Sequence, residues 1–162
     1  MKQPLTVEAA KRAAYDLLSR RAWSRRELRA RLVRRGAPES VARQVVAELE
    51  ARGYVDDQAF ARQWAERRAS RRGLGSRRLS AELKVKGIAR SQATSAIREA
   101  FSETGEEALA LEAGRRRLPA LQRQNPARAP FRLRDYLLRR GYPTEIVSQV
   151  VSRLLSLEDP DR

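Results

Sequence analysis

The pattern Leu-x3-Leu-x3-Gly occurs three times in this chain, and it constrains the fold more than any other feature. Leucines four residues apart lie on one face of a helix, and a glycine just beyond them is typical of a helix end. Ten residues after each glycine another apolar residue indicates a second helix. The copies are Leu28-Leu32-Gly36, Leu79-Leu83-Gly87 and Leu133-Leu137-Gly141, followed by Val46, Ile97 and Val151. The sequence therefore predicts a repeated unit in which a tight glycine turn joins two short helices.

A longer amphipathic helix precedes each pair, so every repeat is expected to contain three helices. We predict an all-α fold: an elongated, curved array of three tandem three-helix, helix-turn-helix-like repeats. The expected repeats span residues 7–53, 54–102 and 103–157. Three prolines within residues 119–130 predict a poorly structured insert in the third repeat, either a long connection or a lid.

Two short helices joined by a tight turn also resemble a DNA-binding helix-turn-helix unit. Small all-helical units make such turns for packing reasons alone, so a single copy favours neither interpretation. Three copies favour an array. They do not by themselves indicate that any helix enters a DNA groove.

The chain carries a formal net charge of +15 at pH 7, and its pI is near 11.4. A charge of this sign and size predicts a polyanionic partner: nucleic acid, a nucleoprotein or an anionic membrane. No apolar run approaches the roughly 20 residues that a membrane span needs. The apolar faces of the helices are expected to pack against one another, so we place a membrane partner last.

The sequence contains neither cysteine nor histidine. Their absence excludes disulfides, thiol catalysis, Ser-His-Asp triads and almost every zinc site. No Gly-rich phosphate loop with lysine, dinucleotide fingerprint or nucleophile motif occurs either. We therefore expect no enzyme, no cofactor and no metal. Because no signal peptide is visible at the N-terminus, we also expect a cytoplasmic protein, and we expect a monomer.

Asp56 and Asp57 are adjacent acids that precede a predicted helix. An acid pair can bind a metal or exchange protons, but a metal needs further oxygen ligands, and none is within obvious reach. We interpret Asp56 as a helix N-cap and Asp57 as an acid favoured by the helix dipole.

Phe60 and Trp64 share one helical face. They either stack on bases or, as we favour, pack in the core of the middle repeat.

Basic residues are concentrated in the middle of the chain. Between Arg67 and Lys86, eight basic residues stand against a single acid, Glu82. A charge run is usually a solvated face, but this imbalance favours a binding face with salt-dependent, sequence-tolerant affinity. The residues predicted to bind the polyanionic partner are Arg25, Arg26, Arg29, Arg67, Arg68, Arg71, Arg72, Arg77, Arg78, Lys84 and Lys86.

The segment from Gly53 to Ile88 contains many residues that match the pattern of one known protein family. It contains Gly53-Tyr54-Val55-Asp56-Asp57, Phe60-Ala61, Trp64 and Arg68, then Gly75, Arg78-Leu79, Glu82-Leu83 and Lys86-Gly87-Ile88. An earlier element fits as well: Tyr15-Leu17-Leu18, Ser24, Glu27-Leu28, Leu32 and Gly36. With these residues the chain resembles the RecX family of recombinase regulators, and its third repeat is the more divergent one.

The resemblance implies a non-enzymatic negative regulator of RecA. Members of the family bind the RecA filament on DNA, along its helical groove, and suppress ATP hydrolysis, strand exchange and the co-protease activity. The implied partners are the RecA filament and single- and double-stranded DNA, contacted directly or through the filament. The implied processes are homologous recombination, DNA repair and the SOS response. Charge and repeats alone leave one alternative open, a general DNA-binding or architectural helix-turn-helix-like protein.

Overall fold

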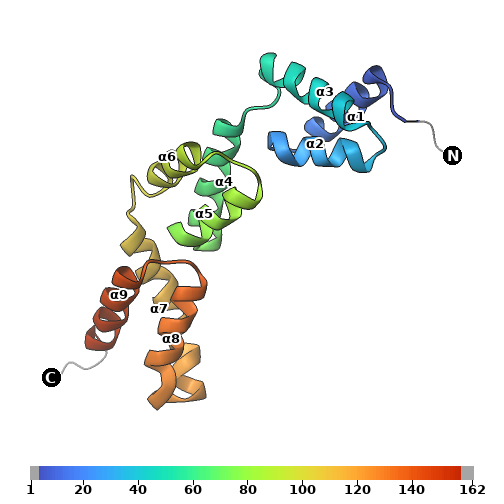
Figure 1. The fold of residues 1–162 in the computed structure, drawn as a ribbon. Coiled ribbons are helices and arrows are strands. Elements are labelled where there is room, and N and C mark those ends of the chain that lie inside the picture. The colour runs from blue at the N-terminus through green and yellow to red at the C-terminus, as the bar shows by residue number, and fades with distance from the viewer. Residues whose placement is uncertain (1–3, 158–162) are drawn as a thin grey trace. The chain divides into compact units, whose positions relative to one another are not determined.

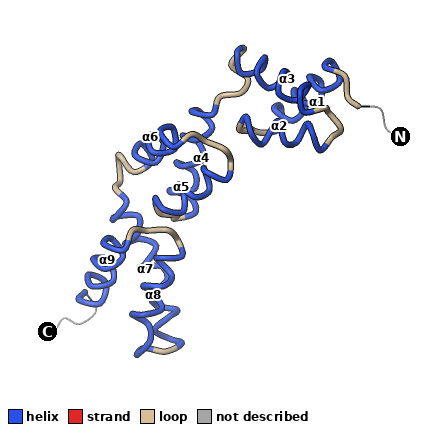
Figure 2. Tube along the Cα trace, viewed as in Figure 1, coloured by secondary structure: helices blue, strands red, loops and turns tan. Residues whose placement is uncertain are grey.

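The computed structural model describes residues 4–157, and every regular element in that range is a helix (Figures 1 and 2). The all-α prediction is confirmed, with three consecutive helix triplets. The first is α1 (Val7–Arg20), α2 (Arg25–Arg34) and α3 (Glu39–Ala51), and the second is α4 (Asp57–Arg72), α5 (Ser76–Val85) and α6 (Arg90–Ala100). The third is α7 (Glu106–Gln124), α8 (Ala129–Arg139) and α9 (Thr144–Leu157), with a short 3-10 helix, η1 (Pro126–Arg128), before α8.

Side-chain caps begin several of these helices. The Thr6 hydroxyl accepts a hydrogen bond from the N–H three residues further on, at 3.2 Å. Ser24 and Glu27 form a capping box at the start of α2. The Asp56 carboxylate accepts an N–H from the first turn of α4 at 3.0 Å, which confirms its interpretation as a cap. Each cap satisfies an N–H group that the first helical turn leaves without a partner.

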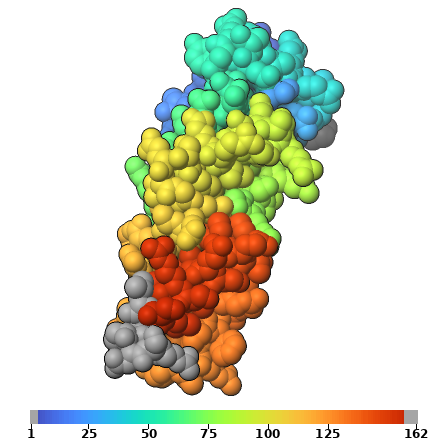
Figure 3. All heavy atoms as spheres, turned by 90° about the vertical axis from the view of Figure 1, so that its left-hand side faces the viewer, coloured from blue at the N-terminus to red at the C-terminus, as the bar shows by residue number. Residues whose placement is uncertain are grey.

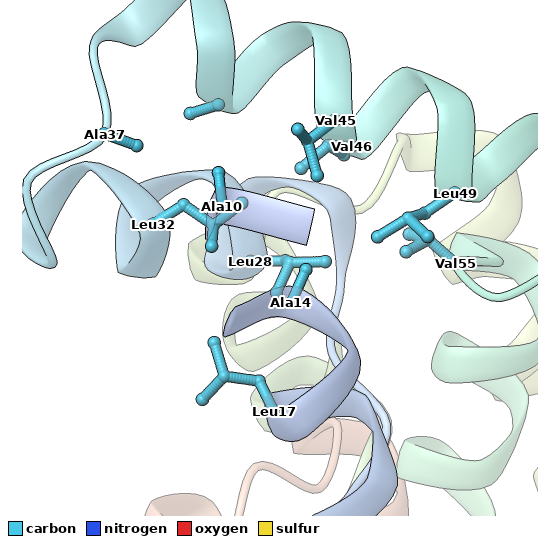
Figure 4. Packing of buried hydrophobic residues seen from close by; sticks show 11 residues of the cluster. Ala10, Ala14, Leu17, Leu28, Leu32, Ala37, Val45, Val46, Leu49 and Val55 are labelled. Atoms are coloured by element: carbon cyan, nitrogen blue, oxygen red, sulfur yellow. The ribbon is translucent and has the colours of Figure 1, made fainter. Parts of the chain in front are cut away.

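The described chain divides into two compact units. The first contains the chain through Gln63 together with Leu83–Ala93. Alanines on α1 allow the three helices of the first repeat to approach closely, and Figure 4 shows their apolar side chains pointing toward one another. The buried cluster consists of Ala10, Ala14, Leu17, Leu28, Leu32, Ala37, Ala42, Val45, Val46, Leu49 and Val55.

The second unit contains Trp64–Glu82 and the chain from Thr94 onward. Its core lies among α7, α8 and α9. The side chains of α8 (orange) and α9 (red) close against each other on the face in Figure 3. The buried cluster consists of Ala110, Leu111, Leu118, Leu121, Ala129, Leu133, Leu137, Tyr142, Val147, Val150 and Leu154.

Helices α4, α5 and α6 of the middle repeat supply residues to both units. Phe60 is 5% exposed, which confirms that it is a core residue. Trp64, one turn later on α4, is only partly buried, so its interpretation as a core residue is confirmed only in part.

The prediction that residues 119–130 are poorly structured was wrong. Helix α7 continues through Pro119, and η1 and α8 follow almost immediately. Proline removes one N–H and crowds the carbonyl four residues earlier. Pro119 and Arg115 both face solvent, where water can bind the freed carbonyl. On the opposite face Leu118 and Leu121 are 2% and 3% exposed, and their burial keeps this segment helical.

The second and third glycine turns each dock on the start of the second helix of the preceding repeat. In the first unit, the Ser24 hydroxyl donates a hydrogen bond to the Lys86 carbonyl at 2.7 Å. In the second unit, the Gly75 N–H donates to the Arg140 carbonyl at 2.8 Å. Carbonyl oxygens of each turn therefore meet a helix N-terminus, the end with unpaired N–H groups and partial positive charge.

An acid at the start of the following repeat binds the same helix end. Asp57 Oδ1 accepts the Arg25 N–H at 2.8 Å, and Glu106 Oε1 accepts the Ser76 N–H at 2.6 Å. Arg25 and Ser76 are the first residues of α2 and α5, while Asp57 and Glu106 are the first residues of α4 and α7. Both junctions therefore combine a carboxylate and a turn carbonyl at one helix N-terminus.

Glycine is required where the third turn meets α5. Gly141 has a φ of +89°, a conformation that other residues rarely adopt. A Cβ placed on Gly75 would lie 2.5 Å from the carbonyl carbon of Gly141, which is backbone and cannot swing away. The turn therefore contacts the start of α5 backbone against backbone, and a side chain at Gly75 would force the two apart.

Candidate polyanion-binding surfaces

A cavity of about 440 Å³ lies among α2, α3 and the start of α4 in the first unit. The three arginines predicted from the first repeat share this concave surface. Its lining consists of Arg25, Arg26, Arg29, Arg43, Val46, Asp57 and Gly87.

Two of these arginines have acidic partners. Arg25 pairs with Glu50, and Arg29 Nε lies 3.2 Å from Glu39 Oε1. The Arg25 and Arg29 side chains are 54% and 46% exposed. Ion pairs this exposed contribute roughly 0–1 kcal/mol, so a phosphate can compete with either carboxylate for its arginine. Arg26 forms no ion pair within residues 4–157, and its stem approaches Gly87.

A second cavity, of about 310 Å³, lies along the C-terminal half of α4 in the second unit. It is lined by Trp64, Arg67, Arg68, Arg71 and Arg72, so four of the predicted binding residues face one hollow beside an aromatic ring. The spacing explains this arrangement, because residues three and four apart share a helix face. Arg67, Arg71 and Arg72 are exposed and form no ion pair in the described part of the chain.

Glu82 on α5 binds three side chains beside this cavity. Its Oε2 accepts the Arg68 Nε–H and the Trp64 Nε1–H, both at 3.0 Å. Its Oε1 accepts a second N–H of Arg68 at 3.1 Å and the Arg78 Nε–H at 3.4 Å. The Arg68 guanidinium also lies 4.7 Å from the centroid of the Trp64 ring. Two of the predicted binding residues, Arg68 and Arg78, therefore share an internal acid.

The remaining predicted residues belong to α5 and the turn after it. Arg77 and Lys84 are exposed. The Lys86 side chain is only 17% exposed, and its Nζ lies 2.6 Å from Glu27 Oε1 and 5.7 Å from the Phe60 ring centroid. Lys86 thus joins its turn to α2 within the first unit. We therefore assign Lys86 a structural contact and no place on the binding surface.

Sequence reasoning missed a third cavity, of about 130 Å³, in the second unit. Arg71 and Arg72 line this cavity as well as the second one, and Arg116, Tyr136 and Arg140 extend it onto α7 and α8. The two cavities therefore adjoin at Arg71 and Arg72, and together their linings come from α4, α7, α8 and the turns after α4 and α8.

A fourth cavity, of about 320 Å³, adjoins the third at Tyr136 and includes Arg117, Arg132 and Arg139. The Arg117 and Arg140 guanidinium carbons lie 5.6 and 5.1 Å from the centroid of the Tyr136 ring. Arginine runs at these positions were visible in the sequence. Nothing in the sequence indicated that Arg116 and Arg140 would lie beside the arginines of α4.

Each titratable group with a shifted pKa contacts a residue of another helix or turn. Burial raises the pKa of Asp57 above its ordinary 3.8, although the N–H that it accepts from Arg25 acts in the opposite direction. Burial also raises the pKa of Tyr142, whose hydroxyl donates to the Gly73 carbonyl at 2.8 Å. A hydrogen bond from Lys11 lowers the pKa of the Glu48 carboxyl.

Within residues 4–157, no group of three or more acidic, histidine or cysteine side chains is arranged to hold a metal ion. None of the helices in the same range combines the length and apolar character needed to cross a membrane. Arginine is the most frequent polar residue in the linings of the four cavities.

These features define a class, an all-helical protein of tandem three-helix repeats that displays arginine-lined cavities. Family models agree segment by segment. Residues 10–49 match the first three-helix domain of RecX, residues 56–97 the second and residues 105–151 the third. The chain belongs to the RecX family. The matched segments do not fix where each repeat ends, so the predicted repeat boundaries stay predictions.

Individual relatives cover nearly the whole chain. The regulatory protein RecX of Mycobacterium avium (strain 104) is 36% identical over 159 residues, which cover 96% of this chain and 90% of that protein. The regulatory protein RecX of Amycolatopsis mediterranei (strain U-32) is 36% identical over 146 residues, which cover 90% and 83%.

Solved structures share the fold. The crystal structure of RecX from Lactobacillus salivarius matches with a TM-score of 0.79 at 15% identity, and the match covers 91% of this chain and 96% of that one. Another crystal structure of a regulatory protein RecX matches with a TM-score of 0.76 at 18% identity, covering 89% and 72%. At these identities the likeness concerns the fold alone.

Proposed function

We propose that this chain is a non-enzymatic negative regulator of RecA. It binds the RecA filament on DNA and suppresses the ATPase, strand-exchange and co-protease activities of the filament. The observation that carries the proposal is the exposed arginine surface of α4, at Arg67, Arg71 and Arg72, in a chain whose relatives are named regulatory protein RecX.

The physical basis is attraction between these arginines and the phosphates of the filament. Arginine binds phosphate through a planar fork of N–H groups. Each phosphate that an arginine neutralises releases a counterion, so binding weakens as salt rises. Arginine-lined cavities lie in both compact units, so each unit offers a surface for phosphate contacts.

The proposal includes the setting in which the regulator acts. The chain works as a cytoplasmic monomer without a cofactor, in homologous recombination, DNA repair and the SOS response. It contacts single- or double-stranded DNA directly or through the filament. The proposed bounds of its three repeats are 7–53, 54–102 and 103–157.

A titration of RecA on single-stranded DNA tests the function. Addition of the chain should lower the ATPase rate at substoichiometric amounts, because one bound regulator affects a filament of many subunits. An unchanged ATPase rate at a molar excess of the chain would contradict the proposal. In the control, the chain is titrated into a labelled oligonucleotide without RecA, and fluorescence anisotropy measures its binding to the DNA.

The second candidate is a general DNA-binding or architectural protein. The arginine-lined cavities favour it, because binding to phosphates needs no recombinase. It predicts tight, salt-sensitive binding to DNA and no association with RecA once nucleic acid is removed. Capture of RecA from a nuclease-treated extract would therefore exclude this candidate.

A further inference from the structure

Glu82 has the surroundings of a bound anion. Both of its carboxylate oxygens accept charge-assisted or indole N–H bonds, from Arg68, Arg78 and Trp64, at distances between 3.0 and 3.4 Å. The Arg68 guanidinium approaches it with two parallel N–H groups, one to each oxygen. This is the bidentate geometry by which arginine recognises carboxylates and phosphates alike.

The same donors are within reach of an external ligand. The Arg68 and Glu82 side chains remain 27% and 18% exposed, and Arg78 is 51% exposed. Arg68 and Trp64 line the cavity of about 310 Å³, with Arg67 and Arg71 in the same lining. A polyanion drawn to those arginines would bring a phosphate beside the Glu82 carboxylate.

We propose that Glu82 occupies a phosphate-binding site of the free protein, and that a nucleic-acid phosphate displaces it from Arg68 and Arg78. The inference rests on the proposed function, since it describes how the same surface receives the DNA of the filament. Glu82 then acts as an internal competitor that lowers the affinity of this site. Nucleic acid is the favoured ligand because the site combines guanidinium groups with the ring of Trp64, as surfaces for single strands do.

Removal of one negative charge at Glu82 tests the proposal directly. In Glu82→Gln the side-chain oxygen can still accept an N–H, but it competes less strongly for the two arginines. The variant should bind a labelled single-stranded oligonucleotide about fivefold more tightly than the wild type, as expected for a partly exposed ion pair. The slope of log affinity against log salt should steepen by about 0.7 for each additional phosphate contact.

Glu66→Gln is the matched control. Glu66 lies on the exposed side of α4, lines none of the four cavities described above and forms no ion pair in the described chain. Its substitution changes the net charge by the same amount. The proposal predicts little gain in affinity for this variant. An equal gain in both variants would assign the effect to net charge and overturn the proposal.

A double variant distinguishes competition with phosphate from a purely structural role of the Arg68–Glu82 pair. Arg68→Gln combined with Glu82→Gln removes the proposed phosphate ligand together with its competitor, so the affinity gain should disappear. Weaker binding by Glu82→Gln, unchanged binding or absence of oligonucleotide binding by every variant would each overturn the proposal. Because RecA is absent from the assay, its outcome is independent of whether the chain inhibits the recombinase. That second question is answered by the ATPase titration.

Discussion

The hydroxyl of Ser24 donates a 2.7 Å hydrogen bond to the carbonyl of Lys86, 62 residues further along the chain. The same oxygen accepts the N–H of Glu27 at 3.2 Å. One fully buried side chain therefore caps α2 and joins it to the glycine turn of the next repeat. The Ser24 hydroxyl therefore contributes both to the N-cap of α2 and to the contact between α2 and the turn at Lys86.

Substitution of Ser24 should reveal this coupling. Ser24→Ala removes the cap of α2 together with the hydrogen bond to the Lys86 carbonyl, so we predict a loss of about 2 kcal/mol in the free energy of unfolding. Urea denaturation followed by circular dichroism measures the change. Ser40→Ala, at an exposed position of α3, should differ little from the wild type. Equal stability of the two variants would show that the Ser24 bonds contribute nothing.

The second junction contains a buried tyrosine that can be tested alone. Tyr142→Phe keeps the ring but removes the hydroxyl that donates to the Gly73 carbonyl at 2.8 Å. We predict a loss of about 1 kcal/mol, since that carbonyl loses its partner. Thermal unfolding measures it, with Tyr54→Phe as the control because Tyr54 is 57% exposed. A Tyr142→Phe variant as stable as its control would argue against a role for the hydroxyl.

Asp57 should make stability depend on pH. Burial raises its folded-state pKa above 3.8, so the stability that this carboxyl contributes is fully present below the unfolded pKa. That contribution is lost as pH rises through the higher folded pKa. We therefore predict that the wild type loses stability relative to Asp57→Asn as pH rises from below 3.8 toward neutral. Urea unfolding at a series of pH values measures the difference.

A companion variant separates charge from hydrogen bonding at this position. Asparagine can still accept the Arg25 N–H, whereas alanine cannot. Asp57→Ala should therefore be less stable than Asp57→Asn at every pH. If the wild type instead gained stability over Asp57→Asn with rising pH, the pKa of Asp57 would be lowered by folding and the assignment would be wrong.

Local features of the fold could be predicted from the sequence because they depend on nearby residues. The Leu-x3-Leu-x3-Gly pattern predicted helix faces and turns, and Asp56 was identified as a cap from its position alone. The docking of Gly75 against Gly141 could not be predicted, since it joins residues far apart in the chain. Pro119 was misread because its effect depends on which helix face is exposed.

Counting charges identified the candidate surface but not the acids that pair with its basic residues. It identified Arg67, Arg71 and Arg72, which remain exposed beside a cavity. It also selected Lys86, whose partner Glu27 lies in the preceding repeat. Counting one acid among eight bases likewise overlooked that Glu82 binds two of those bases at once. A net charge does not reveal which side chains meet after folding.

The central claim is that exposed arginines of α4 bind the filament, and the most direct test is RecA ATPase inhibition by an arginine variant. Glutamine has a helix propensity close to that of arginine, so Arg67, Arg71 and Arg72 changed together to glutamine should leave the fold intact. Arg78 is left unchanged because it also donates to the Arg139 carbonyl at 3.3 Å.

The control changes Arg98, Arg123 and Arg134 to glutamine, which removes the same charge from exposed positions outside the four described cavities. We predict that the α4 variant needs roughly tenfold more protein than the wild type for half-inhibition, because three phosphate contacts are lost. The control should inhibit nearly as well as the wild type, and all three proteins should melt at similar temperatures. Inhibition by the α4 variant equal to that of the wild type would contradict the account.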